Sequence, residues 1–138
     1  MAKSREDLVS WSLKKAEQYL ESAQSNLEKN RLFPAAEEIF RAVETTLEAL
    51  LYHYGIRKIE YPGSPKFTGR MALQFLIRDN LLSRGRIDRA THRKYLDIAS
   101  DLHQAAYTQG VEFKEEDLKK NLQFAEDLLT KAKAQAMK

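Results

Sequence analysis

Apolar residues recur every three or four positions along most of the chain, which is the spacing of one face of an α-helix. The first such stripe joins Val9, Leu13, Ala16, Leu20, Ala23 and Leu27. Ser4, followed three residues later by Asp7, is typical of a helix N-terminal cap, in which a short polar side chain accepts a backbone N–H. The pattern therefore predicts a first helix from a cap at Ser4 to about Asn30.

Four further stretches predict four more helices. Pro34 fits the first turn of a second helix, and Gly55 fits its end. We expect a third helix over 68–82, a fourth from a cap at Asp88 to Gly110, and a fifth that begins at Lys114 or Glu115. The expected inward residues include Ala36, Phe40, Val43, Leu47 and Leu50 in the second helix, Tyr95, Ile98 and Leu102 in the fourth, and Leu118, Leu122, Ala125, Leu128 and Ala132 in the fifth.

These elements predict an all-α fold. Residues 56–67 contain two Pro and one Gly without a helical period, so we expect a long loop there. No stretch has the alternation of a strand. Five amphipathic helices with mostly short links indicate an antiparallel, up-and-down bundle, with the first two helices as its central hairpin. At 138 residues the chain is long enough for one domain, spanning 1–138.

Composition narrows the possible functions. The chain contains no cysteine, which excludes disulfide scaffolds, zinc fingers and thiol nucleophiles. The first residues lack an apolar signal core, and no apolar run approaches the ~18 residues of a membrane span. We therefore expect a cytoplasmic protein that does not enter a membrane.

Basic charge is concentrated in the middle of the chain. The net charge is +3, but residues 56–95 carry ten Lys and Arg against three Asp and Glu. Clustered Arg favours phosphate or carboxylate partners, because the planar guanidinium can bond two oxygens at once. The segment is either an anion-binding or nucleic-acid-binding surface, or a basic face that only meets solvent. The candidate binding residues are Arg86, Arg89, His92, Arg93 and Lys94.

The histidines do not indicate a metal site. They are His53, His92 and His103, and none forms the Glu-x-x-His unit of a di-metal helical bundle. We expect neither a metal nor another cofactor. His103 and Tyr107 are four residues apart on the fourth helix, so their side chains are neighbours. They are candidates for general acid–base catalysis, or alternatively a pair that packs beside the core.

The first helix carries a second apolar flank. Leu8 and Trp11 lie off the main stripe of this helix. Either they form the interface of a homodimer, or the fifth helix covers them.

Two segments carry a family resemblance. Trp11–Gly55 resembles the opening helical hairpin of HEPN-domain proteins, and Ala99–Leu129 is similar to the helix pair that closes small archaeal members. The shared pattern of the hairpin reads here as Ala36, Phe40, Arg41, Ala42, Val43, Glu44, Leu47, Glu48, Ala49, Leu50, Leu51 and Gly55, and the closing pair contains a Leu-His-x-x-x-Tyr element at Leu102, His103 and Tyr107.

The resemblance implies an all-α, usually dimeric protein that acts beside nucleotides or RNA. Members of the superfamily include partners of small nucleotidyltransferases in toxin–antitoxin pairs, and metal-independent ribonucleases. The cleaving members carry an Arg followed four to six residues later by His near the closing helix pair. Here Leu102 and Tyr107 stand at those positions, and the formal match from Arg86 to His92 falls too early in the chain.

Three functions remain open at this point. The first is a non-catalytic, homodimeric module that binds a nucleotide, RNA or a partner protein through the basic residues, with His103 and Tyr107 lining a nearby groove. The second is a metal-independent endoribonuclease that uses His103 and Tyr107. The third is a subunit that docks a nucleotidyltransferase through the Trp11 side or through residues 56–67.

Overall fold

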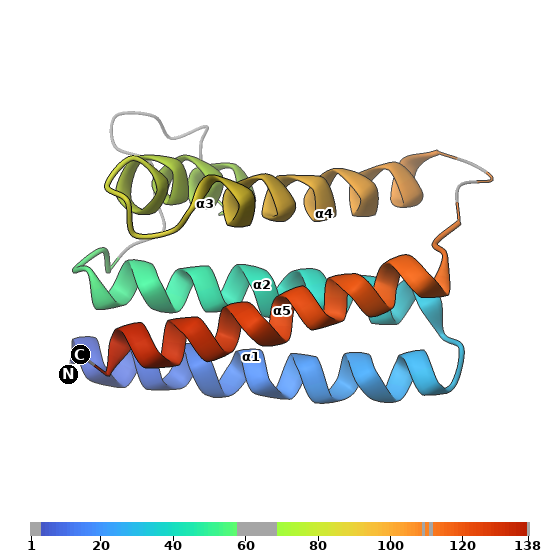
Figure 1. Cartoon of the computed structure of the whole chain (residues 1–138), viewed down its shortest axis with the longest axis horizontal. Helices are drawn as coiled ribbons and strands as arrows, with labels where there is room; N and C mark the ends of the chain where they lie inside the picture. The colour runs from blue at the N-terminus through green and yellow to red at the C-terminus, as the bar shows by residue number, and fades with distance from the viewer. Residues whose placement is uncertain (1–3, 58–68, 109, 111, 138) are drawn as a thin grey trace.

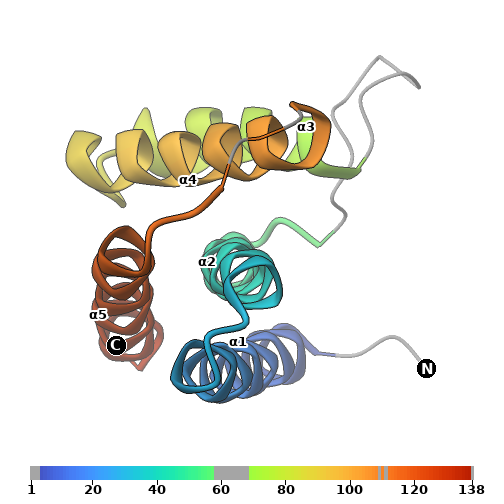
Figure 2. The same cartoon turned by 90° about the vertical axis from the view of Figure 1, so that its right-hand side faces the viewer.

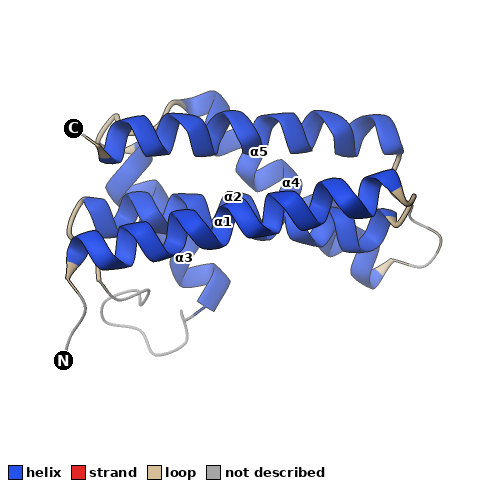
Figure 3. Cartoon of the chain, turned by 90° about the horizontal axis from the view of Figure 1, so that it is seen from below, coloured by secondary structure: helices blue, strands red, loops and turns tan. Residues whose placement is uncertain are grey.

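The computed structural model describes residues 4–57, 69–108, 110 and 112–137. Every regular element in this part of the chain is helical, which confirms the all-α prediction (Figures 1 and 3). The elements are α1 (Arg5–Glu28), α2 (Leu32–His53), α3 (Gly69–Ile77), a π-helical turn η1 (Arg78–Leu82), α4 (Arg89–Tyr107) and α5 (Glu115–Ala136). The predicted loop over 56–67 lies outside the described residues from position 58 onward.

The helices form two layers that meet on α2. In Figure 2, α1, α2 and α5 are seen nearly end-on, and α3 and α4 lie on the far side of α2 from α1 and run across that group. α2 packs against α1, α5, α4, α3 and η1, and the packing of α1 against α2 is the most extensive. The predicted hairpin of the first two helices is therefore present, but α2 alone is central, since α1 lies at the edge of the molecule.

The composition of α2 explains its central position. Small residues on several sides, among them Ala35, Ala42 and Ala49, are almost fully buried and let neighbouring helices approach closely. Two buried threonines satisfy their hydroxyls within the helix: Thr45 donates to the Arg41 carbonyl (2.6 Å) and Thr46 to the Ala42 carbonyl (2.7 Å). Such a helix can be surrounded without leaving these hydroxyls unpaired.

The core joins both layers through aromatic and aliphatic side chains of α2 and α4. The ring of Phe40 on α2 stacks on that of Tyr95 on α4, with centroids 6.2 Å apart and planes within 2°. Both rings are almost completely buried. The predicted inward residues of the fifth helix also lie in or against this core, with Leu122 only partly buried.

Predicted helix starts are confirmed in detail. The Ser4 hydroxyl accepts a hydrogen bond from the Asp7 N–H (3.1 Å), and the Asp7 carboxylate accepts one from the Ser4 N–H (3.4 Å), which is a capping box. Asp88 caps α4 by accepting the Thr91 N–H (2.7 Å), and this bond lowers the pKa of the Asp88 carboxyl.

Two helices end differently from the prediction. α4 stops at Tyr107, three residues before Gly110, because the β-branched Thr108 adopts an extended backbone. The third helix does reach Leu82, but its last five residues form η1, in which the Ser83 N–H donates to the Arg78 carbonyl five residues earlier (2.9 Å). The side chain of Asn80 donates to the Leu76 carbonyl (3.1 Å). This side-chain bond competes with the backbone ladder where the helix widens.

One carboxylate lies in a poorly solvated position between α1 and α2. Burial, the largest cause, and the neighbouring Glu44 raise the pKa of Glu48, Lys15 of α1 lowers it, and the net pKa is about 7. Burial and the charge of Glu48 together also raise the pKa of Tyr52. Glu48 is thus a group whose ionisation opposes folding.

We expect this group to make the protein less stable as pH rises. In the unfolded chain Glu48 ionises near its ordinary pKa of 4.5, whereas the folded protein holds the proton until about pH 7. The folded state therefore binds more protons between these values, and the free energy of unfolding falls across this window. Glu48→Gln should be more stable than wild type by about 3 kcal/mol at pH 8 and nearly equal to it at pH 4.5, as measured by urea unfolding. Glu21→Gln, at an exposed position on α1, is the control; an equal gain in both variants would contradict the account.

Candidate nucleic-acid interface

The outward face of α4 presents two arginines that other described residues do not engage. Arg89 and Arg93 are exposed and four residues apart, so they lie on the same side of the helix. Neither forms an ion pair with any residue that the structure describes. Both guanidinium groups are therefore available to an anion in solution.

The same face continues to an aromatic pair at the other end of α4. Arg93, Ser100 and Tyr107 follow one another at seven-residue intervals, which returns to nearly the same side of a helix. The fourteen residues from Arg93 to Tyr107 correspond to about 21 Å along the axis. The rings of His103 and Tyr107 are in contact, with centroids 4.6 Å apart and planes inclined by 43°. Tyr107 is 79% exposed and His103 is exposed as well, so neither belongs to the core.

We call this strip the α4 face, and define it by Arg89, Arg93, Ser100, His103 and Tyr107. A groove of about 580 Å³ runs along one edge of it, between α4 and α3, with Phe40 of α2 in its lining. The sequence pattern did not predict the α3 wall of the groove, Met71 and Gln74, because the apolar spacing within each helix does not show how two helices face one another. The lining residues are Phe40, Met71, Gln74, Leu96, Ala99, Ser100, Leu102, His103, Ala106 and Tyr107.

The other predicted binding residues do not join the α4 face. His92 is half-buried beside Arg78, and burial followed by the Arg78 charge lowers the pKa of its imidazole. It is therefore neutral at pH 7 and adds no positive charge. Lys94 lines a hollow on the flank of α4 that faces α5, together with Asp97, Asp101 and Asp117.

Arg86 takes part in an internal contact cluster. Its guanidinium lies over the Tyr54 ring at 3.8 Å from the centroid and donates to the Asn80 carbonyl (3.3 Å). Gln135 of α5 donates to the Tyr54 hydroxyl and to the Arg86 carbonyl (3.2 Å). We call Tyr54, Asn80, Arg86 and Gln135 the end clamp, since they link the C-terminal ends of α2 and α5 to the segment between η1 and α4.

The predicted dimer flank lies on the outer side of α1. Trp11 is 45% exposed, Leu8 is half-buried, and the ammonium of Lys15 lies 4.4 Å from the centroid of the Trp11 ring. Nearly half of this tryptophan thus remains accessible in the single chain, and a homodimer through Leu8 and Trp11 stays a prediction.

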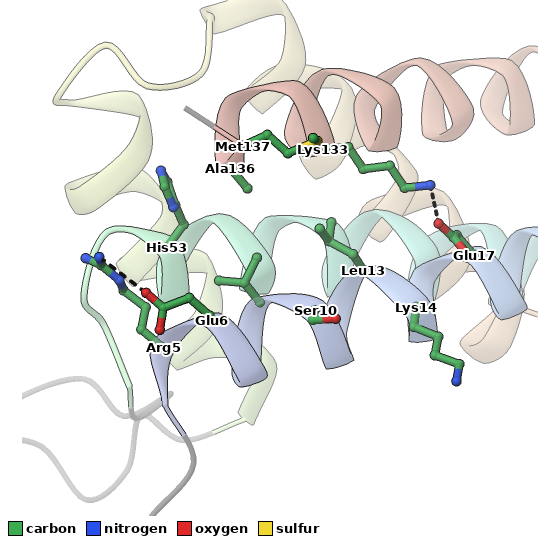
Figure 4. Close-up of a pocket in the computed structure, with 11 residues that line it drawn as sticks. Arg5, Glu6, Ser10, Leu13, Lys14, Glu17, His53, Lys133, Ala136 and Met137 are labelled. Carbon is green, nitrogen blue, oxygen red and sulfur yellow. Dashed lines mark ion pairs between the residues drawn. The ribbon is translucent and has the colours of Figure 1, made fainter.

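A further cavity lies at the other end of the molecule from Tyr107, where α1 begins and α5 ends (Figures 1 and 4). It has a volume of about 760 Å³. Its rim holds two ion pairs, Arg5 with Glu6 (3.8 Å) and Lys133 with Glu17. Because these charges satisfy one another, the cavity offers apolar surface but little unneutralised charge. The lining residues are Arg5, Glu6, Val9, Ser10, Leu13, Lys14, Glu17, His53, Lys133, Ala136 and Met137.

The residues that the structure describes contain no group of three or more His, Asp or Glu side chains placed to hold a metal ion. No described helix combines the length and the hydropathy that a membrane-spanning segment requires.

The chain matches one protein family over most of its length. The family model described as Archaeal PaREP1/PaREP8 family matches residues 12–129, which run from within α1 into α5. The chain belongs to this family. The PaREP1/PaREP8 match therefore includes the whole of α4 and both arginines of its outward face. No curated protein and no solved structure matches the chain.

The end clamp predicts that Arg86 contributes more than Arg89 to the free energy of unfolding. Arg86→Ala removes the contact with Tyr54 and the hydrogen bond to Asn80, so the free energy of unfolding should fall by about 1–2 kcal/mol. Arg89→Ala, at an exposed position of the same segment, should change it by less than about 0.5 kcal/mol. Urea unfolding of both variants measures the difference, and equal values would contradict the structural role of Arg86.

Proposed function

We propose that the protein binds single-stranded RNA along the α4 face. The observation that carries this proposal is the combination, on one helix face, of two exposed and unpaired arginines with two exposed aromatic rings in contact. Phosphates attract guanidinium groups, and unpaired bases stack on aromatic side chains. A folded duplex would not offer its bases to such a surface.

The dimensions of the α4 face suit a short single strand. The distance of about 21 Å from Arg93 to Tyr107 can be followed by a few nucleotides of extended chain. Arg89 and Arg93 would contact phosphates at one end of this length, and His103 with Tyr107 would stack bases at the other. Asp97 and Asp101, both exposed, flank the α4 face on the side toward α5. Their negative charges repel phosphates, so they would disfavour a path of the RNA backbone on that side.

The proposal agrees with the HEPN resemblance of Trp11–Gly55 and Ala99–Leu129. In that context we propose an HEPN-like, homodimeric RNA-binding component of a toxin–antitoxin system, with a nucleotidyltransferase as a partner. The dimer would use Leu8 and Trp11 on the outer side of α1. This leaves the α4 face free, because α1 and α4 lie on opposite sides of α2 (Figure 2).

A second candidate function is metal-independent RNA cleavage. The observation that favours it is the exposure of the His103 imidazole at the groove edge, in contact with the Tyr107 ring. An imidazole there can exchange a proton with a ribose hydroxyl of a bound strand.

We expect charge reversal on the α4 face to weaken RNA binding and to reduce its dependence on salt. Single-strand binding releases about 0.7 counterions per neutralised phosphate. Arg89→Glu combined with Arg93→Glu should therefore lower the slope of log affinity against log salt by about 1.4. Fluorescence anisotropy with a labelled eight-nucleotide oligo(U), over a salt series, measures the slope.

The matched control changes the same amount of charge on the other side of α2. Arg5→Glu combined with Lys14→Glu alters α1 by the same four charges, and it should leave the slope unchanged. A wild-type slope in the Arg89 and Arg93 variant, or an equal loss in the control, would contradict binding by the α4 face.

Cleavage distinguishes the second candidate from the first. If His103 acts on the strand, labelled RNA incubated in EDTA should be cut by the wild type, and His103→Ala should abolish the cutting while retaining binding and the helical circular dichroism spectrum. Binding without any cutting would support the RNA-binding function and contradict cleavage by His103.

A further inference from the structure

A second hollow adjoins the α4 face, on the other side of Tyr107 from the groove. It has a volume of about 410 Å³ and lies between the C-terminal end of α4 and the N-terminal end of α2. Tyr107 and Ala106 line both this hollow and the groove. The remaining lining residues are Phe33, Ala105, Thr108, Gly110 and Glu112.

Two aromatic side chains from different helices border this hollow. Phe33 of α2 is 50% exposed, and Tyr107 of α4 is 79% exposed. Each is braced by a second ring outside the hollow: Phe33 by Phe113, with centroids 5.3 Å apart and planes at 75°, and Tyr107 by His103. Rings held by neighbours lose less freedom when a planar ligand stacks on them. The hollow is thus suited to a flat aromatic group.

The exposed carboxylate of Glu112 restricts which flat group fits best. An ionised carboxylate only accepts hydrogen bonds, and it has two oxygens side by side. Among the four RNA bases, guanine alone presents two adjacent N–H donors on its Watson–Crick edge. Adenine, cytosine and uracil place an acceptor next to each donor there, and a carboxylate repels that acceptor.

We propose that the hollow between Phe33 and Tyr107 is a guanine-binding site, with Glu112 accepting the two donors of the base. The inference rests on the proposed RNA binding in one respect, since it takes the guanine from a strand that lies along the α4 face. Tyr107 would then stack the last base of the α4 face on one side and contribute to the guanine site on the other.

The experiment compares eight-nucleotide oligo(U) with the same oligomer carrying one guanosine, inosine or adenosine at its fifth position. By anisotropy, guanosine should raise the affinity about tenfold, as expected for charge-assisted hydrogen bonds at an exposed site. Inosine, which lacks one of the two donors, should give a smaller gain, and adenosine none. Equal affinities for the guanosine and adenosine oligomers would overturn the proposal.

Substitutions around the hollow test which side chains give the preference for guanosine. Glu112→Gln should remove the gain from guanosine and leave the affinity for oligo(U) unchanged, whereas Glu116→Gln, at an exposed carboxylate four residues further along the chain, should alter neither. Phe33→Leu should reduce the gain while retaining an apolar side chain. A guanosine gain that survives Glu112→Gln would overturn the role of this hollow.

Guanosine monophosphate tests whether the hollow binds a free nucleotide or only a base within a strand. Competition by this nucleotide against the guanosine oligomer, lost in Glu112→Gln, would identify a free nucleotide as a sufficient ligand. No competition would identify the strand as the source. If no oligomer binds at all, the proposed function fails, and binding of the nucleotide alone, measured by calorimetry, still tests the hollow: heat of binding that Glu112→Gln abolishes supports it, and no heat overturns it.

Discussion

The burial of α2 on nearly every side constrains the rest of the molecule. Its small side chains and internally bonded threonines allow α1 and α5 to pack on one side and α3 with α4 on the other. Because α4 uses Tyr95 and Ile98 to cover α2, only its inner side is committed to the core. The outer side is left to solvent along its whole length, and it is there that Arg89, Arg93, His103 and Tyr107 lie.

The functional proposals follow from this division of α4. One flank meets α3 across a groove, and the other meets α5 across a hollow whose charged lining is two lysines and three carboxylates. The face between them combines basic and aromatic groups. At the end of that face, Tyr107 and Phe33 line the same hollow, because α2 begins where α4 ends. The α4 face proposed to bind a strand and the hollow proposed to bind one base therefore both depend on how α2 and α4 are arranged.

The sequence predicted the helices well, since their apolar spacing and caps are local properties: the bonds at Ser4 and Asp88 are those that the residue types suggest. It did not predict that α3 and α4 cross the other helices, or that the third helix ends as a π-turn, because both depend on packing between distant segments. For the candidate site, the His103–Tyr107 contact followed from helical spacing, whereas Arg86 could not be recognised as internal. Its partners, Tyr54 and Gln135, are distant in sequence, and an arginine beside Arg84 and Arg89 has the same local appearance whether it is exposed or engaged.

Mapping the RNA-contacting residues by nuclear magnetic resonance tests the central claim most directly. Amide chemical shifts of ¹⁵N-labelled protein, titrated with the guanosine-containing oligomer, should move along α4 from Arg89 to Tyr107 and at Phe33 and Glu112. Those of Arg5–Glu17, a segment that contributes to the cavity between the start of α1 and the end of α5, should stay in place. Shifts concentrated at that cavity with none along α4 would contradict the account, as would a spectrum that saturating RNA leaves unchanged.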